Sequence, residues 1–274
     1  MLRYGHDIRP YEAGHLVESP FGDCLDVLVD TAGSKTLRKY PVIFLGGEQE
    51  LSRKKAGKLL DYLHAGGTII ASITQLPEEI KAAAGITAIS NIWWGAVLSP
   101  YDYDLTESVE TGKKFGGMRY ECTALEVKKG KVLGVNHRKF TLIWEVPCCS
   151  KGKIVLTGVI YSQDCLRSGL LPLFKHIFGR YIREHLLALT EPSTLELIVN
   201  RGEGCLLVAA FNNTAQPWTG EITVKLDGVV SRMVKLQETW NETSIFTGRA
   251  GKTLSFKDSI PAFEFKVYRV DFGH

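Results

Sequence analysis

The feature that most limits the fold is a regular exchange of apolar runs with amphipathic segments between about residues 24 and 82. The apolar runs CLDVLVD, PVIFLGG and GTIIASI are each followed by a segment that favours a helix. Continuous Val, Ile and Leu in a strand indicate burial on both faces, as in a parallel sheet covered by helices on both sides. This part of the chain therefore predicts an α/β fold with a doubly wound sheet.

The segment SRKKAGKLLDYLHAGG carries the strongest helical signal in this region. Ser52 is the expected N-cap, and Gly66 or Gly67 is the expected stop. One apolar stripe recurs at helical spacing and consists of Ala56, Leu59, Leu60 and Leu63. We therefore expect a helix with one buried face.

Two later segments have a different rhythm. Residues 88–150 contain shorter and more polar β-like runs, which predict a β-rich insertion in a first domain over 1–190. Residues 191–274 alternate apolar and polar positions in short runs separated by Gly, Asn and Asp, which predicts a small antiparallel β-sandwich domain. The expected domain boundary lies near residue 190.

Charge and cysteine usage exclude several classes of function. The 274 residues hold 33 Lys and Arg against 30 Asp and Glu, without a basic block of the kind that follows a phosphate backbone, so nucleic acid is not an expected partner. No apolar run reaches the roughly 20 residues that span a bilayer, so no membrane is expected. The six cysteines show no zinc-like spacing, although Cys148 and Cys149 are adjacent. We expect reduced, mostly structural cysteines, a cytoplasmic protein, and no metal or cofactor.

Ser72 raises the question of a catalytic nucleophile, because it ends the strand in GGTIIASITQL. A nucleophile on a strand-to-helix elbow needs small neighbours that relieve the strain of the turn. Ala71 and Ile73 flank Ser72 where such an elbow has glycine nearby. We therefore interpret Ser72 as a degenerate elbow whose hydroxyl bonds to local backbone, and we expect no catalytic residue in this chain.

An aromatic and acidic segment offers the other candidate site. Aromatic rings can stack on sugars, and four of them lie close together in the sequence: Trp93, Trp94, Tyr101 and Tyr103. Packing in a core or interface is the alternative for the tryptophan pair. Asp102, Asp104 and Glu107 could supply paired carboxylates for glycoside hydrolysis, or form a solvated turn.

Four stretches together resemble the region downstream of the catalytic barrel in β-galactosidase-like glycoside hydrolases. They are FGDCLDVLVDTA, LRKYPVIFLGGEQELSRKKAGKLLDYLHAGGTIIAS, SKGKIVLTGVIY followed by LLPLFKHIF, and LELIVNRGEGCLLVAAFNNT. In that family a flavodoxin-like, class I amidotransferase-like "trimerisation" domain precedes a small β-sandwich. The resemblance implies that the catalytic barrel is missing from this chain and lies in the same gene or on a separate chain. It also implies a homo-oligomer.

The resemblance bears on Ser72 as well. Active class I amidotransferases place an oxyanion-hole amide on a strand similar to LGG at 45–47, and their nucleophile is a cysteine where this chain has Ser72. Their histidine base would fall in GVIYSQD, where Tyr161 and Ser162 stand instead. The resemblance therefore implies a scaffold without its reactive residues.

Three functions follow as rival hypotheses. The chain is an accessory, non-catalytic portion of a glycoside hydrolase that serves packing, oligomerisation and shaping of the substrate cleft. Alternatively, it is a stand-alone carbohydrate-binding protein, or an amidotransferase-like hydrolase that uses Ser72. Because no apolar strand precedes residue 24, we also expect a fragment or split gene product with an exposed edge near its first strand.

Overall fold

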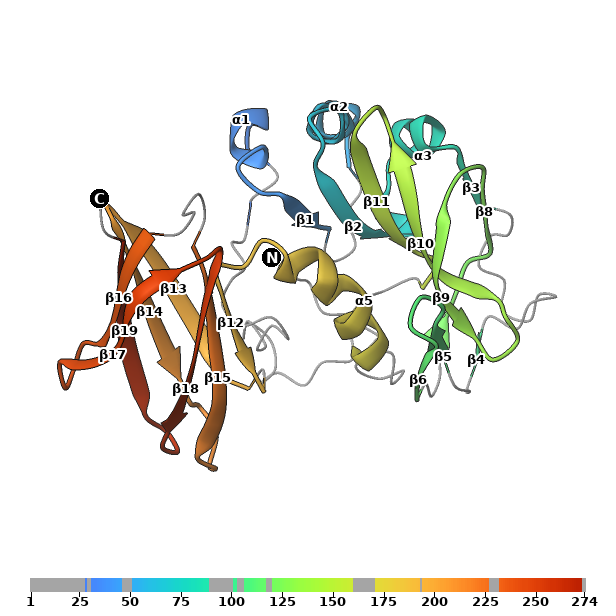
Figure 1. The fold of residues 1–274 in the computed structure, drawn as a ribbon. Helices are drawn as coiled ribbons and strands as arrows, with labels where there is room; N and C mark the ends of the chain where they lie inside the picture. The colour runs from blue at the N-terminus through green and yellow to red at the C-terminus, as the bar shows by residue number, and fades with distance from the viewer. Residues whose placement is uncertain are drawn as a thin grey trace, which may run out of the picture. The chain divides into compact units, whose positions relative to one another are not determined.

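The computed structural model describes residues 28, 31–45, 51–88, 101–102, 106–116, 120–159, 171–192, 194–226 and 232–272. Its described residues form two compact units, 28–182 and 183–272 (Figure 1). Among the described helices, none combines the length and apolar character that crossing a bilayer requires. The domain boundary expected near residue 190 from the sequence stays a prediction.

The first unit is built on a sheet with the strand order β1-β2-β11-β10-β9-β5-β6. Only the pairs β1–β2 and β2–β11 are parallel, and the other pairs in this sheet are antiparallel. The strands are β1 (Val42–Phe44), β2 (Thr68–Ser72), β5 (Thr106–Ser108), β6 (Lys113–Phe115), β9 (Lys131–Asn136), β10 (Thr141–Cys148) and β11 (Gly152–Thr157). Two short ladders accompany it, β3 (Ile86–Ala88) with β8 (Leu125–Val127) and β4 (Tyr101–Asp102) with β7 (Tyr120–Glu121).

Helices cover this sheet because its central strands are apolar on both faces. Helices α2 (Arg53–His64) and α3 (Glu78–Ala84) share a core with Ile69 and Ile154. Helix α5 (Leu171–Arg183) lies on the other side of the sheet (Figure 1). Short helices α1 (Ser34–Leu37) and η1 (Ile73–Gln75) complete the unit.

The predicted amphipathic helix is confirmed as α2. Ser52 is its N-cap, and Gly66 follows the C-cap with a φ of 98°, a conformation that favours glycine. A Cβ at Gly67 would lie 2.2 Å from the ring of Tyr62, so the second glycine also fits this helix end closely. The predicted stripe is buried except for the half-buried Leu60.

The expected flavodoxin-like, class I amidotransferase-like doubly wound sheet is wrong. The protein is mainly β, with 49% strand and 19% helix, and most pairs in its largest sheet are antiparallel. The cause is the hairpin between β10 and β11, because it brings an antiparallel strand next to the last parallel one. Strands β10, β9, β5 and β6 then continue the main sheet beyond β11.

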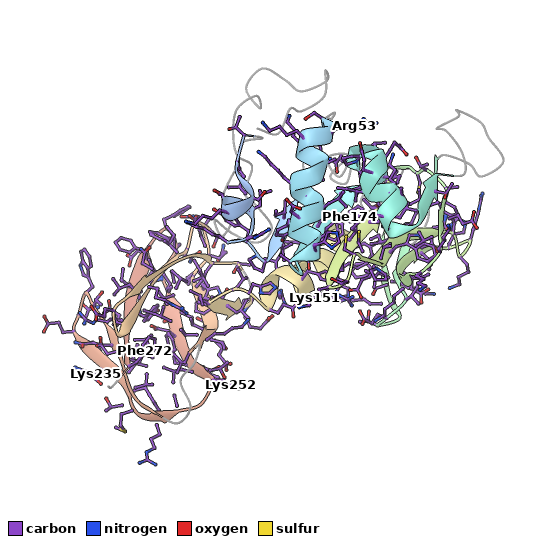
Figure 2. All side chains as sticks on the ribbon, turned by 90° about the horizontal axis from the view of Figure 1, so that it is seen from above. Arg53, Lys151, Phe174, Lys235, Lys252 and Phe272 are labelled. Atoms are coloured by element: carbon purple, nitrogen blue, oxygen red, sulfur yellow. The ribbon has the colours of Figure 1, made fainter. Side chains whose placement is uncertain are left out.

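The second unit consists of two antiparallel sheets around one core, the arrangement of a β-sandwich. Buried residues alternate along its strands, and their side chains fill the space between the sheets (Figure 2). One sheet has the order β12-β15-β18, and the other β13-β14-β19-β16-β17. The strands are β12 (Ala188–Glu191), β13 (Glu196–Gly202), β14 (Cys205–Phe211), β15 (Trp218–Lys225), β16 (Arg232–Glu238), β17 (Thr243–Ala250), β18 (Thr253–Ile260) and β19 (Phe265–Phe272).

Candidate functional site

A shallow cleft of about 450 Å³ lies at the turn between β10 and β11. The sequence CCSKGK shapes this turn in two ways. Cys149 adopts a φ of 58°, in the left-handed region that residues other than glycine rarely enter. Gly152 begins β11, where a Cβ would lie only 2.3 Å from the backbone oxygen of Leu63. The turn is therefore held against the end of α2.

The walls of the cleft carry more positive than negative charge. Lys131 pairs with Glu145 across β9 and β10, and Lys153 pairs with Pro147 across β10 and β11. Because residues two apart share a face of a strand, Lys131, Glu145 and Lys153 lie on one face of the sheet. Lys151 adds a third ammonium group from the turn. The cleft therefore favours an anionic ligand.

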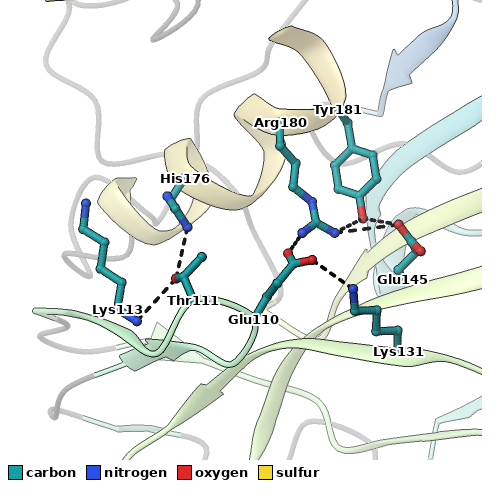
Figure 3. A network of polar contacts seen from close by, with 8 residues as sticks. All are labelled: Glu110, Thr111, Lys113, Lys131, Glu145, His176, Arg180 and Tyr181. Atoms are coloured by element: carbon teal, nitrogen blue, oxygen red, sulfur yellow. Dashed lines mark hydrogen bonds and ion pairs between the residues drawn. The ribbon is translucent and has the colours of Figure 1, made fainter. Parts of the chain in front are cut away.

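A polar network ties helix α5 to the sheet beside this cleft (Figure 3). The guanidinium of Arg180 forms an ion pair with Glu110 and lies 3.8 Å from a carboxylate oxygen of Glu145. It also donates a hydrogen bond of 2.7 Å to the hydroxyl of Tyr181, which in turn donates to Glu145. Lys131 completes the network, with its Nζ 2.9 Å from Glu110.

The contacts of this network connect α5 with β10 and with Glu110. Burial, and then the hydrogen bond to Glu145, raise the pKa of Tyr181 well above its ordinary value, so Tyr181 is a neutral donor. Glycoside hydrolysis needs an acid and a second carboxylate on either side of a sugar. Here Arg180 contacts both Glu110 and Glu145. This arrangement joins α5 to the sheet and places both carboxylates against one guanidinium.

His176 lies on the same face of α5, one turn before Arg180. Its Nε2 is 3.4 Å from the hydroxyl of Thr111, and its ring packs against Phe115 with centroids 5.3 Å apart. The sequence offered no partner set for His176, because Thr111 lies 65 residues away along the chain. Only the folded chain brings the two together.

Ser72 ends β2 and is 1% exposed. Its hydroxyl donates to the backbone oxygen of Val159, and its amide donates a 2.8 Å hydrogen bond to the side chain of Gln75. Its φ of −78° and ψ of 153° are those of ordinary extended backbone. The geometry is that of a helix N-cap before η1.

The predicted aromatic site lies mostly outside the described residues. Trp93, Trp94 and Tyr103 are not among them, and Tyr101 is described only as backbone that pairs with Glu121 in the β4–β7 ladder. Of the acidic residues in that segment, Asp104 is not described. Glu107 forms an ion pair of 3.2 Å with Lys139.

The second unit presents a different set of aromatic residues, which we call the aromatic row: Phe211, Phe265 and Trp240. Phe211 and Phe265 lie opposite each other on β14 and β19, with stacked rings 5.4 Å apart. Trp240 meets Phe265 edge-on at 5.7 Å. Trp240 is 76% exposed and Phe265 is 46% exposed, so the row is open to solvent. Adjoining exposed aromatic side chains make the row a candidate binding surface.

Buried charge positions the tryptophan of this row. Glu238 is 4% exposed and accepts hydrogen bonds of 2.7 Å from the amide of Trp240 and 2.9 Å from the amide of Asn241. The side chain of Asn241 donates a third, at 2.8 Å. Phe211, Phe265 and Trp240 were not among the candidate site residues predicted from the sequence. The signal was present, since Phe211 and Phe265 occupy the outward positions of alternating strands.

Within the described ranges, no cluster of three or more His, Cys, Asp or Glu could hold a metal ion. The cleft and the aromatic row are therefore the two candidate sites of the described chain.

Comparison with known proteins gives a fold but no family. No family model matches this sequence, and no curated protein matches it. Alpha-L-fucosidase isoenzyme 2 from Paenibacillus thiaminolyticus matches with a TM-score of 0.66 and 15% identity, over 91% of this chain and 43% of its own. Gan42B, a GH42 beta-galactosidase from G. stearothermophilus, matches with a TM-score of 0.58 and 12% identity, over 85% of this chain and 32% of its own.

A cold-adapted beta-galactosidase from Rahnella sp. R3 matches with a TM-score of 0.54 and 14% identity, over 91% of this chain and 35% of its own. This chain thus spans 32% to 43% of the length of these enzymes. At such identities the likeness concerns the fold, which is that of a region within glycoside hydrolases.

Proposed function

We propose that this chain is an accessory, non-catalytic C-terminal portion of a glycoside hydrolase. The observation that carries the proposal is the difference between the share of this chain and the share of the enzymes that the structural matches cover. The glycoside hydrolases named above match nearly all of this chain, which spans less than half of theirs. Its role is to pack against a catalytic barrel that this sequence does not contain, and to help shape the substrate cleft.

The polar groups of the first unit support a non-catalytic role. Arg180 engages both carboxylates beside the cleft, and the hydroxyl of Ser72 is buried and bonded to backbone. Neither group is arranged to transfer a proton to a glycosidic oxygen. Hydrolysis then depends on carboxylates of the barrel.

An edge of the sheet, as far as the described residues form it, supports the proposal of a partner or a homo-oligomer. Strand β1 forms one edge of the described main sheet, and Phe44 on this strand is 43% exposed. An edge strand leaves backbone donors and acceptors open to another chain. A barrel domain or a second copy of this chain would cover this edge.

Hydrolysis of nitrophenyl glycosides tests the proposal. We expect the purified chain alone to release no nitrophenol from nitrophenyl β-galactoside or α-fucoside above a protein-free blank. Added in excess to the isolated barrel domain of a β-galactosidase, without that enzyme's own C-terminal region, it should raise the activity of the barrel. A saturable rate for the chain alone contradicts the proposal, and so does a failure to bind or activate any such barrel.

A second function, binding of carbohydrate by the chain itself, is favoured by the aromatic row. Calorimetry against neutral oligosaccharides, with Trp240→Ala, is the test. We expect this variant to lower the affinity at least about fivefold, because stacking on one exposed ring contributes about 1 kcal/mol or more. Met233→Ala is the matched control, since Met233 is 52% exposed on the same sheet. Trp93→Ala and Trp94→Ala test the aromatic segment predicted from the sequence. Equal affinities for all four variants would exclude the aromatic row as the carbohydrate-binding site.

A further inference from the structure

Two neighbouring thiols lie where strand β10 meets the cleft. Cys148 is the last residue of β10, and Cys149 is the first residue of the following turn. Their Sγ atoms are 3.6 Å apart. Cys148 is 1% exposed, whereas Cys149 is half-buried and lines the cleft. One thiol of the pair is therefore accessible, and the other stands directly behind it.

The surroundings of Cys149 are cationic. Lys131, Lys151 and Lys153 line the same cleft of about 450 Å³, although the charge of Lys131 is paired with Glu110. The one carboxylate in its lining, Glu145, is engaged by Tyr181 and Arg180. A small anion that carries a reactive sulfur would be attracted to this cleft and would meet Cys149 there.

The two cysteines differ in reactivity. Burial, and then the hydrogen bond and charge of Cys149, raise the pKa of Cys148 to about 12. A thiol attacks as its thiolate, so Cys148 is a poor first nucleophile. Cys149 is the group that a reagent in the cleft contacts first.

We propose that Cys148 and Cys149 form a thiol–disulfide exchange site for small anionic disulfides. Cys149 loses its proton to solvent and attacks one sulfur of the disulfide, which forms a mixed disulfide and expels one small thiolate. Cys148 then attacks the Sγ of Cys149, and its proton passes to the second small thiolate as that thiolate leaves. The two thiolates take up the two protons. In sum, one disulfide is reduced to two thiols, and the protein dithiol is oxidised to a vicinal disulfide.

Closure of the vicinal disulfide is reversible for a geometric reason. Neighbouring Cα atoms are about 3.8 Å apart. Most disulfides join Cα atoms that are roughly 4.4–6.8 Å apart, and departures from that range make the bond easier to reduce. The site therefore returns to the dithiol when excess reduced thiol is present.

Oxidised glutathione, which is anionic, is the probe. The full chain is exposed to it, quenched with acid at intervals, and digested so that the peptide holding both cysteines is read by mass spectrometry. We expect an early glutathionyl adduct on Cys149, followed by loss of the two thiol hydrogens as the pair closes. Cys148→Ser should stall at the adduct on Cys149, and Cys149→Ser should leave Cys148 unmodified over the same time. The early adduct is also measured in the unaltered chain. The proposal can therefore be tested even if a variant fails to fold.

Charge gives the discriminating control. Lys151→Glu reverses one exposed charge at the cleft and should slow the reaction with oxidised glutathione roughly fivefold. The same variant should not slow the reaction with cystamine, a cationic disulfide. Cys122 and Cys205 are half-buried thiols elsewhere in the chain and set the background rate. Modification of Cys149 no faster than these two, or an equal loss of rate with both reagents in Lys151→Glu, would overturn the proposal.

Discussion

Replacing Glu238 with glutamine should destabilise the second unit by about 2 kcal/mol. One carboxylate oxygen accepts from the amide of Trp240, and the other accepts from the amide and side chain of Asn241. Glutamine has only one oxygen, so its NH₂ group would face at least one N–H donor. A hydrogen bond to a charged group contributes about 1.5–3 kcal/mol, which sets the expected loss.

Glu242→Gln is the matched control, because it removes the same charge from an exposed position in the same turn. We expect the control to change the free energy of unfolding by less than about 0.5 kcal/mol. Urea unfolding, read from hydrogen exchange in β16 and β17, follows the second unit on its own. With a slope of roughly 1–2 kcal/mol per molar urea, the midpoint of Glu238→Gln should fall by about 1–2 M.

The pH dependence follows from the same contacts. Burial alone would raise the pKa of Glu238, but the hydrogen bonds from Trp240 and Asn241 outweigh burial and hold the pKa below its usual value. A lowered pKa in the folded state stabilises the protein above the unfolded value of about 4.3, and this stabilisation is lost as pH falls through the folded pKa. The gap between the unaltered chain and Glu238→Gln should therefore narrow below about pH 4. A gap of under about 0.5 kcal/mol at pH 7, or one that persists unchanged at low pH, would refute this reasoning.

Two further pairs of substitutions test how the first unit is held together. Gly152→Ala places a Cβ 2.3 Å from the backbone oxygen of Leu63, so the free energy of unfolding should fall by about 1–3 kcal/mol in a denaturant titration. Gly57→Ala, in the middle of α2 with open space around it, should instead raise it by up to about 1 kcal/mol. Arg180→Met leaves two carboxylates without their shared partner and should speed hydrogen exchange in α5, whereas Lys175→Met, at an exposed position of the same helix, should not. Equal effects within either pair would contradict the structure.

The local elements of this chain could be predicted because their signals are local. The spacing of Ala56, Leu59 and Leu63 defines the buried face of α2, and Ser52 and Gly66 mark its ends. Alternation along residues 205–211 likewise defines a strand with one buried face. Such patterns depend only on which face of a short segment is buried. They therefore hold whatever the order of the other helices and strands.

The arrangement of the strands could not be predicted, because periodicity gives a strand without its neighbours. Within the run KIVLTGVIY, β11 pairs in parallel with β2. Its other neighbour, β10, is joined to it by the turn at Cys149, which has a left-handed backbone. The network at Arg180 was missed for the same reason, since Glu110 and Glu145 reach it from distant strands.

Ser72 allows a final prediction, because strand ends of this kind carry nucleophiles in other enzymes. Ser72 is 1% exposed, its hydroxyl donates to the backbone oxygen of Val159, and its backbone is unstrained. We therefore expect a fluorophosphonate probe to leave Ser72 unlabelled while it labels a serine hydrolase added to the same tube. Ser72→Ala should lower the free energy of unfolding by about 1–2 kcal/mol, since the backbone oxygen of Val159 loses a buried donor. Labelling that disappears in Ser72→Ala would show a reactive serine, and would mean that the hydrogen bond to Val159 opens readily.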